Sequence, residues 1–290
     1  MISGVAKSIT IVSFNKNEAD AVEDLLSDIA SGPPSPWARD GATGISRHFG
    51  PDEWRLEHVA VRAQGNVIAA AQLAEIFSDR DKKPDYVVFY GCAGALRGQD
   101  AKSAFLIQYA NYVSLGTVGI DRGVEKVTLK NKWLCALEPT GDVDPLPPVS
   151  FPMAIPGRSP LDLSALTGIP GARVIATDKV VRIRPSAPPV PVVPPPPSAR
   201  YQKGEWTYGQ ALSLWVGPDG PVVVEMESYG IGRIGQALKL DDRVVVLRVT
   251  TDSLADHADS DVDQRALLHA ARALLGHVLA ALFNPTYFQP

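Results

Sequence analysis

Apolar runs alternate with amphipathic stretches through the first half of the chain. Residues 8–14 form a continuous run rich in Ile and Val, which is typical of a strand covered on both faces. Asn15 can cap the helix that we expect over residues 18–29, because Glu18 follows it at capping-box spacing. The same pattern predicts a helix at 66–77 and further strands at 58–63, 86–90, 102–110 and 132–137.

The alternation resumes in the second half of the chain. We expect a helix at 229–238 and strands at 173–176, 222–224 and 243–249. Residues 261–283 carry apolar side chains at the three-and-four spacing of one buried helical face. His269 and His277 lie off that face and eight residues apart, so we expect two solvated histidines and no metal pair.

Strands that alternate with helices predict a central sheet with helices on both faces. We therefore expect a three-layer α/β/α fold with a mixed, mostly parallel sheet, in a single domain over residues 1–290. In sheets of this kind a ligand binds beyond the carboxyl ends of the strands, where the connecting loops meet. Polar residues that follow apolar strands are therefore the candidate site residues.

Prolines interrupt this pattern. The chain has 25 prolines, and 16 of them fall between Pro139 and Pro197. We expect residues 139–205 to form a Pro-rich, irregular insertion region within the domain. Residues 185–197 must be polyproline II or disordered, because proline fixes φ and supplies no backbone N–H.

Composition and charge narrow the classes of function. Hydrophobic residues make up 45% and charged residues 21% of the 290, which is ordinary for a soluble globular chain. The formal net charge of -4 argues against a general nucleic-acid binder, which needs excess positive charge. We expect a cytoplasmic protein with no membrane span, since the chain lacks a signal-peptide core and any run of about 18 apolar residues. No metal and no cofactor is expected, because the cysteines form no CxxC pair and the histidines have no ligand spacing.

The first candidate site is FYGCAGAL at residues 89–96, directly after a predicted strand. Gly91 and Gly94 allow either a simple strand-to-loop turn or a turn whose N–H groups meet a ligand. The chain has neither a GxGxxG nor a GxxxxGK[ST] sequence, so nucleotide-phosphate loops of those two kinds are excluded.

The second and third candidates carry carboxylates. In VVVEMES, Glu225 and Glu227 would point the same way if the strand continued, and buried charges need partners. Those partners are either vicinal sugar hydroxyls or the first turn of the following helix. In RVTTDSLAD, Asp252 follows a strand and precedes Asp256, so it is either a helix cap or a general acid with a raised pKa.

Taken in order, three short motifs resemble the nucleoside phosphorylase and nucleosidase superfamily. They read Gly-Cys-Ala-Gly at 91–94, Val-Glu-Met-Glu at 224–227 and Thr-Asp-Ser-Leu-Ala-Asp at 251–256. The set is most similar to methylthioadenosine/S-adenosylhomocysteine nucleosidases, which carry Gly-Ser-Ala-Gly, Val-Glu-Met-Glu and Ser-Asp-x-Ala-Asp. The opening strand and its acidic turn also resemble the first strand of that family, and the spacing is compatible outside the Pro-rich region.

The resemblance implies a role for each matching residue. Asp252 matches the family's general acid, which protonates purine N7 and so makes the base a better leaving group. Glu18 matches the carboxylate that orients and deprotonates the attacking water. Glu227 matches the acid that binds the ribose hydroxyls, with Met226 packing on the sugar and Glu225 as a further acid in the pocket.

Two positions depart from the family pattern. Cys92 stands where the family has Ser, beside Ala93 and Gly94, and this weakens a hydroxyl contact to base or water. Val180 stands near the position of a Phe that stacks on the base. Because Val cannot stack, either the base pocket differs or another aromatic residue serves: Tyr201, Trp206 or Tyr208.

Hydrolysis is favoured over phosphorolysis because Glu18 lies where a phosphorylase would bind phosphate, although Lys16 argues the other way. The prediction is a hydrolase that releases the free base from a purine nucleoside or nucleotide. The alternatives are a phosphate-dependent phosphorylase and a non-catalytic nucleotide-binding module. The family implies a homo-oligomer, a dimer or higher. The Pro-rich region, with basic residues on both sides, is a solvated spacer, a lid for a 5′-phosphate or a PxxP docking site.

Overall fold

The computed structural model describes much of the chain before and after residues 178–219, including parts of the Pro-rich region. The described residues are 8–31, 37–40, 44–49, 52–78, 83–97, 103–113, 119–121, 124–126, 149–151, 163–177, 220–252 and 260–283. The structural statements below concern these residues. The strand predicted at 132–137 lies outside them, as do the residues of the polyproline prediction.

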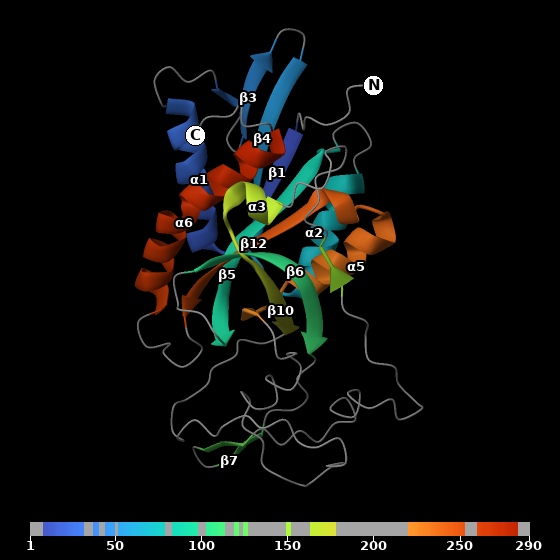
Figure 1. Cartoon of the computed structure of the whole chain (residues 1–290), viewed down its shortest axis with the longest axis vertical. Helices are drawn as coiled ribbons and strands as arrows, with labels where there is room; N and C mark the ends of the chain where they lie inside the picture. The colour runs from blue at the N-terminus through green and yellow to red at the C-terminus, as the bar shows by residue number, and fades with distance from the viewer. Residues whose placement is uncertain are drawn as a thin grey trace.

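A ten-stranded mixed sheet forms the centre of the fold (Figure 1). Its strands are β1 (Ser8–Ser13), β2 (Ala38–Asp40), β3 (Gly44–Phe49), β4 (Asp52–Ala60), β5 (Tyr86–Arg97), β6 (Ala104–Val113), β9 (Val149–Ser150), β10 (Gly171–Thr177), β11 (Val222–Glu225) and β12 (Val244–Asp252). A separate pair consists of β7 (Gly119–Asp121) and β8 (Val124–Lys126). The helices are α1 (Lys16–Ser31), α2 (Asn66–Ser78), α3 (Leu163–Thr167), α5 (Ser228–Leu238), α6 (Ser260–Phe283) and the 3-10 turn η2 (Asp241–Arg243).

The strand order is β11-β10-β6-β12-β5-β1-β4-β3-β2, with β9 paired to β6. Strand β11 also pairs with β5, so β5, β12, β6, β10 and β11 close into a ring. The expectation of a mixed α/β sheet is confirmed. The described pairings are five parallel and five antiparallel, and the sheet is mostly parallel by paired length, because the longest registers are those of β12 with β5 and β10 with β6. The short connections of β2, β3 and β4 force neighbouring strands to run in opposite directions.

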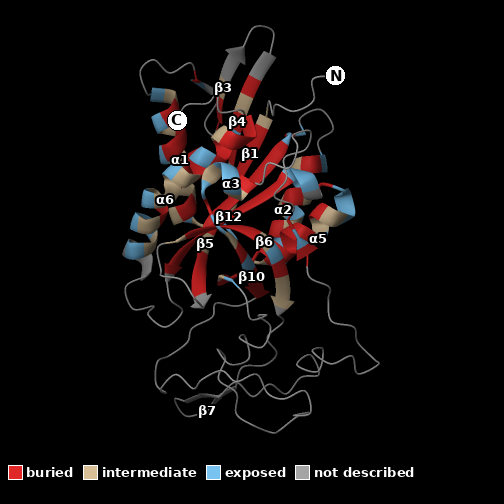
Figure 2. Cartoon of the chain, viewed as in Figure 1, coloured by how far each residue is buried: buried red, intermediate tan, exposed pale blue. Residues whose placement is uncertain are grey.

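Helices cover both faces of this sheet. Helices α1 and α6 pack on one face and α2 and α5 on the other, each with its own apolar cluster (Figure 1). Alternation along β5 divides its side chains, since Val88 and Tyr90 join the first cluster and Val87 and Phe89 the second. Burial is concentrated in the strands between the helices (Figure 2). Strands buried on both faces explain the continuous apolar runs of the sequence.

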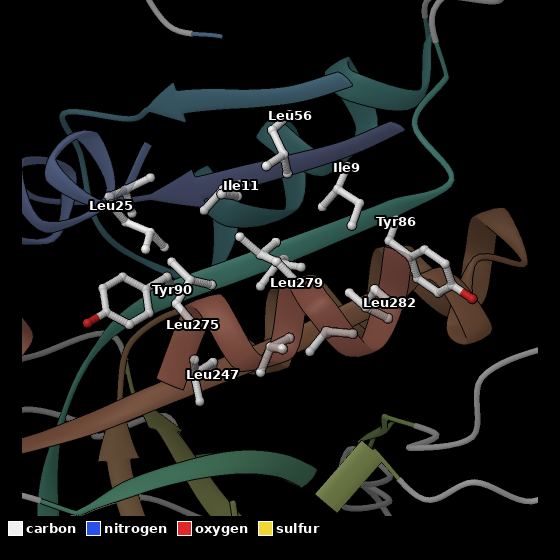
Figure 3. Packing of buried hydrophobic residues seen from close by; sticks show 14 of the residues in the cluster. Ile9, Ile11, Leu25, Leu56, Tyr86, Tyr90, Leu247, Leu275, Leu279 and Leu282 are labelled. Atoms are coloured by element: carbon white, nitrogen blue, oxygen red, sulfur yellow. The ribbon is translucent and has the colours of Figure 1, made fainter. Parts of the chain in front are cut away.

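Helix α6 is the main covering of the first face. Leu275, Leu279 and Leu282 lie against the strands in Figure 3, and all three are buried. The segment Asp263–Phe283 is long and apolar enough to cross a membrane by length and composition, although the sequence analysis expected no membrane span. Half of its most apolar window is buried inside the protein, which is the arrangement of a core helix.

Two local predictions have different outcomes. The capping box is confirmed, because the N–H of Glu18 donates to Oδ1 of Asn15 at 2.9 Å and the N–H of Asn15 donates to Oε2 of Glu18 at 3.2 Å. The solvated-histidine prediction holds for His277, which is exposed. It is wrong for His269, whose ring is partly buried with Nδ1 3.0 Å from Oδ2 of Asp24 on α1.

A buried polar chain joins β1, β4 and α1. Nε2 of His58 lies 2.9 Å from Oγ of Ser13, and its Nδ1 lies 2.6 Å from Oε1 of Glu23. Ser13 is fully buried and His58 nearly so, which makes this chain a structural link and no nucleophile. Burial lowers the pKa of His58 below its ordinary 6.5, and Glu23 opposes this shift only in part.

This shift predicts acid sensitivity that depends on His58. Well above pH 6.5 the ring is neutral in both the folded and the unfolded chain, so His58 does not lower the free energy of unfolding. As pH falls, the unfolded chain takes up the proton first, so stability is lost. We expect His58→Gln to flatten the fall in the free energy of unfolding below about pH 6.5. Urea unfolding across this range measures it, with the exposed His277→Gln as control. Parallel curves for wild type and His58→Gln would contradict the prediction.

Candidate active site

The site lies where the ends of several strands meet. Strand β5 runs parallel to β1 on one side and to β12 on the other, so their carboxyl ends share one edge. Strand β11 reaches the same place through its antiparallel pairing with the last part of β5. This topology brings four of the predicted site residues around the side chain of Arg248: Glu18, Cys92, Glu225 and Glu227.

Arg248, in the middle of β12, is fully buried. Its Nη2 donates to Oε2 of Glu225 at 2.7 Å and to Oε2 of Glu227 at 3.2 Å. Burial lowers the pKa of Arg248, but the two carboxylates overcome that effect and raise it above its ordinary value. The site therefore contains a permanent positive charge, which a buried position tolerates only with such partners.

The carboxylate of Glu225 has a structural role. Its carboxylate accepts the backbone N–H of Glu227 and that of Ser228, both at 3.0 Å, in addition to the bond from Arg248. These two N–H groups lie at the start of α5, where helical donors have no partner within the helix. The helix-capping alternative therefore applies to Glu225, which also neutralises Arg248.

Glu227 is held more loosely. Besides the bond from Arg248, its Oε1 accepts the N–H of Gly65 at 3.3 Å. Burial raises its pKa to about 8, Arg248 opposes the rise, and the neighbouring carboxylates of Glu225 and Glu18 add to it. A carboxylate has about four acceptor positions, so Glu227 retains capacity for further donors. Asn66, the residue after Gly65, has a buried Nδ2, and Ser228, the residue after Glu227, has a buried Oγ; neither atom has a partner among the described residues.

Glu18 is buried at the start of α1 and faces β5. Its Oε2 accepts the N–H of Phe14 at 2.8 Å and that of Asn15, and its Oε1 accepts the N–H of Cys92 at 2.9 Å. Three of about four acceptor positions are thereby filled. The thiol of Cys92 also hydrogen-bonds this carboxylate, and Oε1 is the oxygen that faces Gly91 and Arg248.

Gly91 gives the site its space. It lies opposite Arg248 in the register of β5 and β12. A Cβ at this position would overlap Nη1 of Arg248 and stand 2.8 Å from Oε1 of Glu18. Glycine is therefore required by close approach, since the guanidinium and the carboxylate occupy the volume of a side chain. The predicted turn at 91–94 is wrong: pairing with β12 and β11 keeps these residues extended within β5.

Solved structures match this arrangement of elements over nearly the whole chain. The methylthioadenosine/S-adenosylhomocysteine nucleosidase of Neisseria meningitidis, in complex with methylthio-immucillin-A, is 15% identical, with a TM-score of 0.51 over 95% of this chain and 98% of that one. The futalosine hydrolase of Helicobacter pylori is 12% identical, with a TM-score of 0.55 over 95% and 98%. The chain has the nucleosidase fold.

A third structure agrees. The Helicobacter pylori methylthioadenosine/S-adenosylhomocysteine nucleosidase in complex with a substituted pyrrolidin-3-ol is 13% identical, with a TM-score of 0.55 over 97% of this chain and all of the other. No protein-family model and no curated protein matches the sequence. The nucleosidase fold is therefore shown by structural similarity. At such low sequence identity, similarity of fold does not establish activity, which must be argued from the residues of the site.

The remaining predicted residues of the nucleosidase fold are placed as follows. Ala93 and Gly94 are buried in β5, and Met226 is partly buried between the two glutamates. Asp252 ends β12, with its backbone paired to Gly94. Val180 lies outside the described residues. Among the residues that the structure describes, no group of His, Cys, Asp and Glu is placed to hold a metal ion.

The sequence analysis missed Arg248. A signal was present, because the Arg interrupts the apolar sequence VVVLRV, and a charge in a strand covered on both faces needs carboxylate partners. Its Nε and Nη1 have no hydrogen-bond partner within the described part of the chain. Buried donors without partners are rare in native proteins, so these atoms are available to a ligand or water.

Proposed function

We propose that the protein is a hydrolase that cleaves the N-glycosidic bond of a purine nucleoside or nucleotide and releases the free base. The observation that carries this proposal is the buried cluster of Glu18, Glu225 and Glu227 around Arg248. It lies at the carboxyl edge of a sheet with the nucleosidase fold. The solved neighbours named as nucleosidases and hydrolases support the same class of reaction.

The charges of the cluster suit this reaction. Departure of the base leaves positive oxocarbenium charge on the sugar. Three carboxylates around a single guanidinium give a site that stabilises a cation once they are ionised. Glu227, with its acceptor capacity, is proposed to bind the sugar hydroxyls, and the unpartnered Asn66 Nδ2 and Ser228 Oγ are proposed as further donors to the sugar.

Glu18 and Arg248 are proposed to hold the attacking water. Oε1 of Glu18, which also lies within reach of the Cys92 thiol, and the unpartnered Nη1 of Arg248 both face Gly91. A water that accepts from Nη1 and donates to Oε1 is oriented for attack, and Glu18 can take its proton. Asp252, at the end of β12, is the proposed acid for the departing base.

The same geometry disfavours phosphorolysis. Lys16, the residue that argued for phosphate, is exposed, and its Nζ lies 2.6 Å from Oδ2 of Asp20. Arg248 is already paired with Glu225 and Glu227. A phosphate dianion entering beside Glu18 would meet the charges of the nearby carboxylates, and the described cation beside them, Arg248, is already paired; such like-charge contact is unfavourable.

Several further features of the protein are proposed from the sequence alone. We propose a single three-layer domain over residues 1–290 that contains a Pro-rich insertion. The prediction that all of residues 139–205 are an irregular insertion is wrong for β9, α3 and β10, which lie within these bounds and belong to the fold. Purine specificity, Val180 as a base contact, a homo-oligomeric state and a cytoplasmic location belong to the same proposal. The basic residues beside the prolines leave nucleoside and 5′-nucleotide substrates open.

A substrate panel tests the proposed function. The protein is incubated without phosphate with a mixture of purine nucleosides and their 5′-phosphates, and released bases are identified by mass. We expect a free base from at least one substrate, and a loss of about 10²-fold or more in Asp252→Asn. Tight binding without release would favour the non-catalytic module. The absence of both binding and release would contradict the proposal.

A further inference from the structure

The first turns of α6 are tied to β5 by side chains that the proposed reaction does not use. Nε2 of Gln264 donates to Sγ of Cys92 at 3.1 Å, and Oε1 of Gln264 accepts Nδ2 of Asn17 at 2.9 Å. One turn further along, the hydroxyl of Tyr90 donates to the carbonyl of Leu268 at 2.7 Å. Gln264 therefore bridges α1 and β5 at the edge of the site.

Cys92 connects this bridge to Glu18. Its backbone N–H donates to Oε1 of Glu18, and its thiol hydrogen-bonds the same carboxylate. Its sulfur accepts from Gln264 and, at 3.7 Å, from Nδ2 of Asn15. Burial and the charge of Glu18 raise the pKa of the thiol well above its ordinary value, so Cys92 stays protonated and serves as a contact, not a nucleophile.

Gln264 also lies close in sequence to the proposed acid. Helix α6 begins at Ser260, eight residues after Asp252. The backbone of Asp252 is paired with β5 at Gly94, and Gln264 returns the chain to β5 at Cys92. Asp252 and Gln264, which lie on either side of residues 253–259 in the sequence, thus both contact β5.

We infer that Gln264 is a positioning residue that holds the Glu18 side and the Asp252 side of the site in register, an inference that rests on the proposed function. It acts through Cys92 and Asn17 and does not touch the reacting atoms. Correct placement of two reacting groups is sensitive to shifts of about 1 Å, which can cost about 10²-fold in rate. Loss of the bridge should therefore lower kcat and leave binding of the sugar unchanged.

The test compares Gln264→Leu, which keeps the size of the side chain and removes both bonds, with Arg265→Gln. Arg265 is the neighbouring exposed residue, so its variant is the matched control. For Gln264→Leu we expect kcat to fall about 10- to 100-fold with KM within about twofold of wild type. In a Cys92→Ala background the same change should cost much less, because the contact is already lost.

Hydrogen exchange gives a readout that does not depend on activity. In Gln264→Leu we expect amides of the first two turns of α6 to exchange about tenfold faster, while those of its last two turns are unchanged. A wild type that releases no base would refute the proposed function, and exchange would still report on the bridge. An active wild type with unchanged kcat in Gln264→Leu, or unchanged exchange, would overturn the inference about Gln264.

Discussion

Arg248→Met is expected to lower the free energy of unfolding by about 3–5 kcal/mol and to abolish base release. Met fills a similar volume but leaves the carboxylates of Glu225 and Glu227 buried without their cation. Removing one partner of a buried ion pair costs more than the pair itself contributes, because the remaining charge keeps its desolvation penalty. Urea unfolding at neutral pH measures the loss.

Two companion variants make this prediction specific. Arg243→Met, at an exposed position of η2, should change stability little. The double variant Arg248→Met/Glu227→Gln should be no less stable than Arg248→Met alone, because without the cation the pKa of Glu227 rises above about 8 and the group is already neutral at neutral pH. If Arg248→Met were as stable as wild type, or if the double variant were less stable than the single one, the cluster would not be organised by Arg248.

Glu18→Gln is expected to reduce kcat for base release by about 10²- to 10⁴-fold. The amide keeps the size of the carboxylate but cannot accept a proton from water. Its single oxygen also cannot accept the N–H groups on both sides, so we expect a loss of about 1–3 kcal/mol in stability. Rate at saturating substrate and thermal unfolding separate the two effects.

The control for Glu18→Gln is Asp20→Asn. Asp20 lies on the same helix, two residues on, and is paired with the exposed Lys16. Its variant should retain wild-type kcat, because its carboxylate pairs with the exposed side chains of Lys16 and Arg265. Retention of full activity in Glu18→Gln would show that another group activates the water.

The apolar pattern was sufficient to predict most elements of the fold. The prediction for 261–283 falls within one residue of α6, because its leucine face and its length leave no alternative. Strands β2 and β3 were missed, since short polar strands such as ARD and GISRHF lack a strong apolar alternation. The extension of β5 through Gly91 depends on pairing with β12 and β11, and long-range pairing is not visible in a local pattern.

The residues of the site likewise divide into those that a local sequence pattern indicates and those that depend on long-range packing. The capping role of Glu18 was predictable because it depends only on residues 15 to 18, which are close in the sequence, whereas its role in the site was taken from the family resemblance. The different roles of Glu225 and Glu227 were not predictable, because they depend on where β11 ends and how α5 meets Arg248. The Gln264–Cys92 contact joins residues 172 apart, so only the packing of α6 on β5 reveals it.

The identity of the nucleophile is the most direct test of the account. A substrate that the panel identifies is incubated with wild-type protein, with and without inorganic phosphate. Base release is followed by absorbance, and the phosphate is followed by ³¹P NMR. We predict the same rate of base release in both samples, free sugar as the second product and no consumption of phosphate. Base release that requires phosphate and converts it in equal amount to a sugar 1-phosphate would contradict the account.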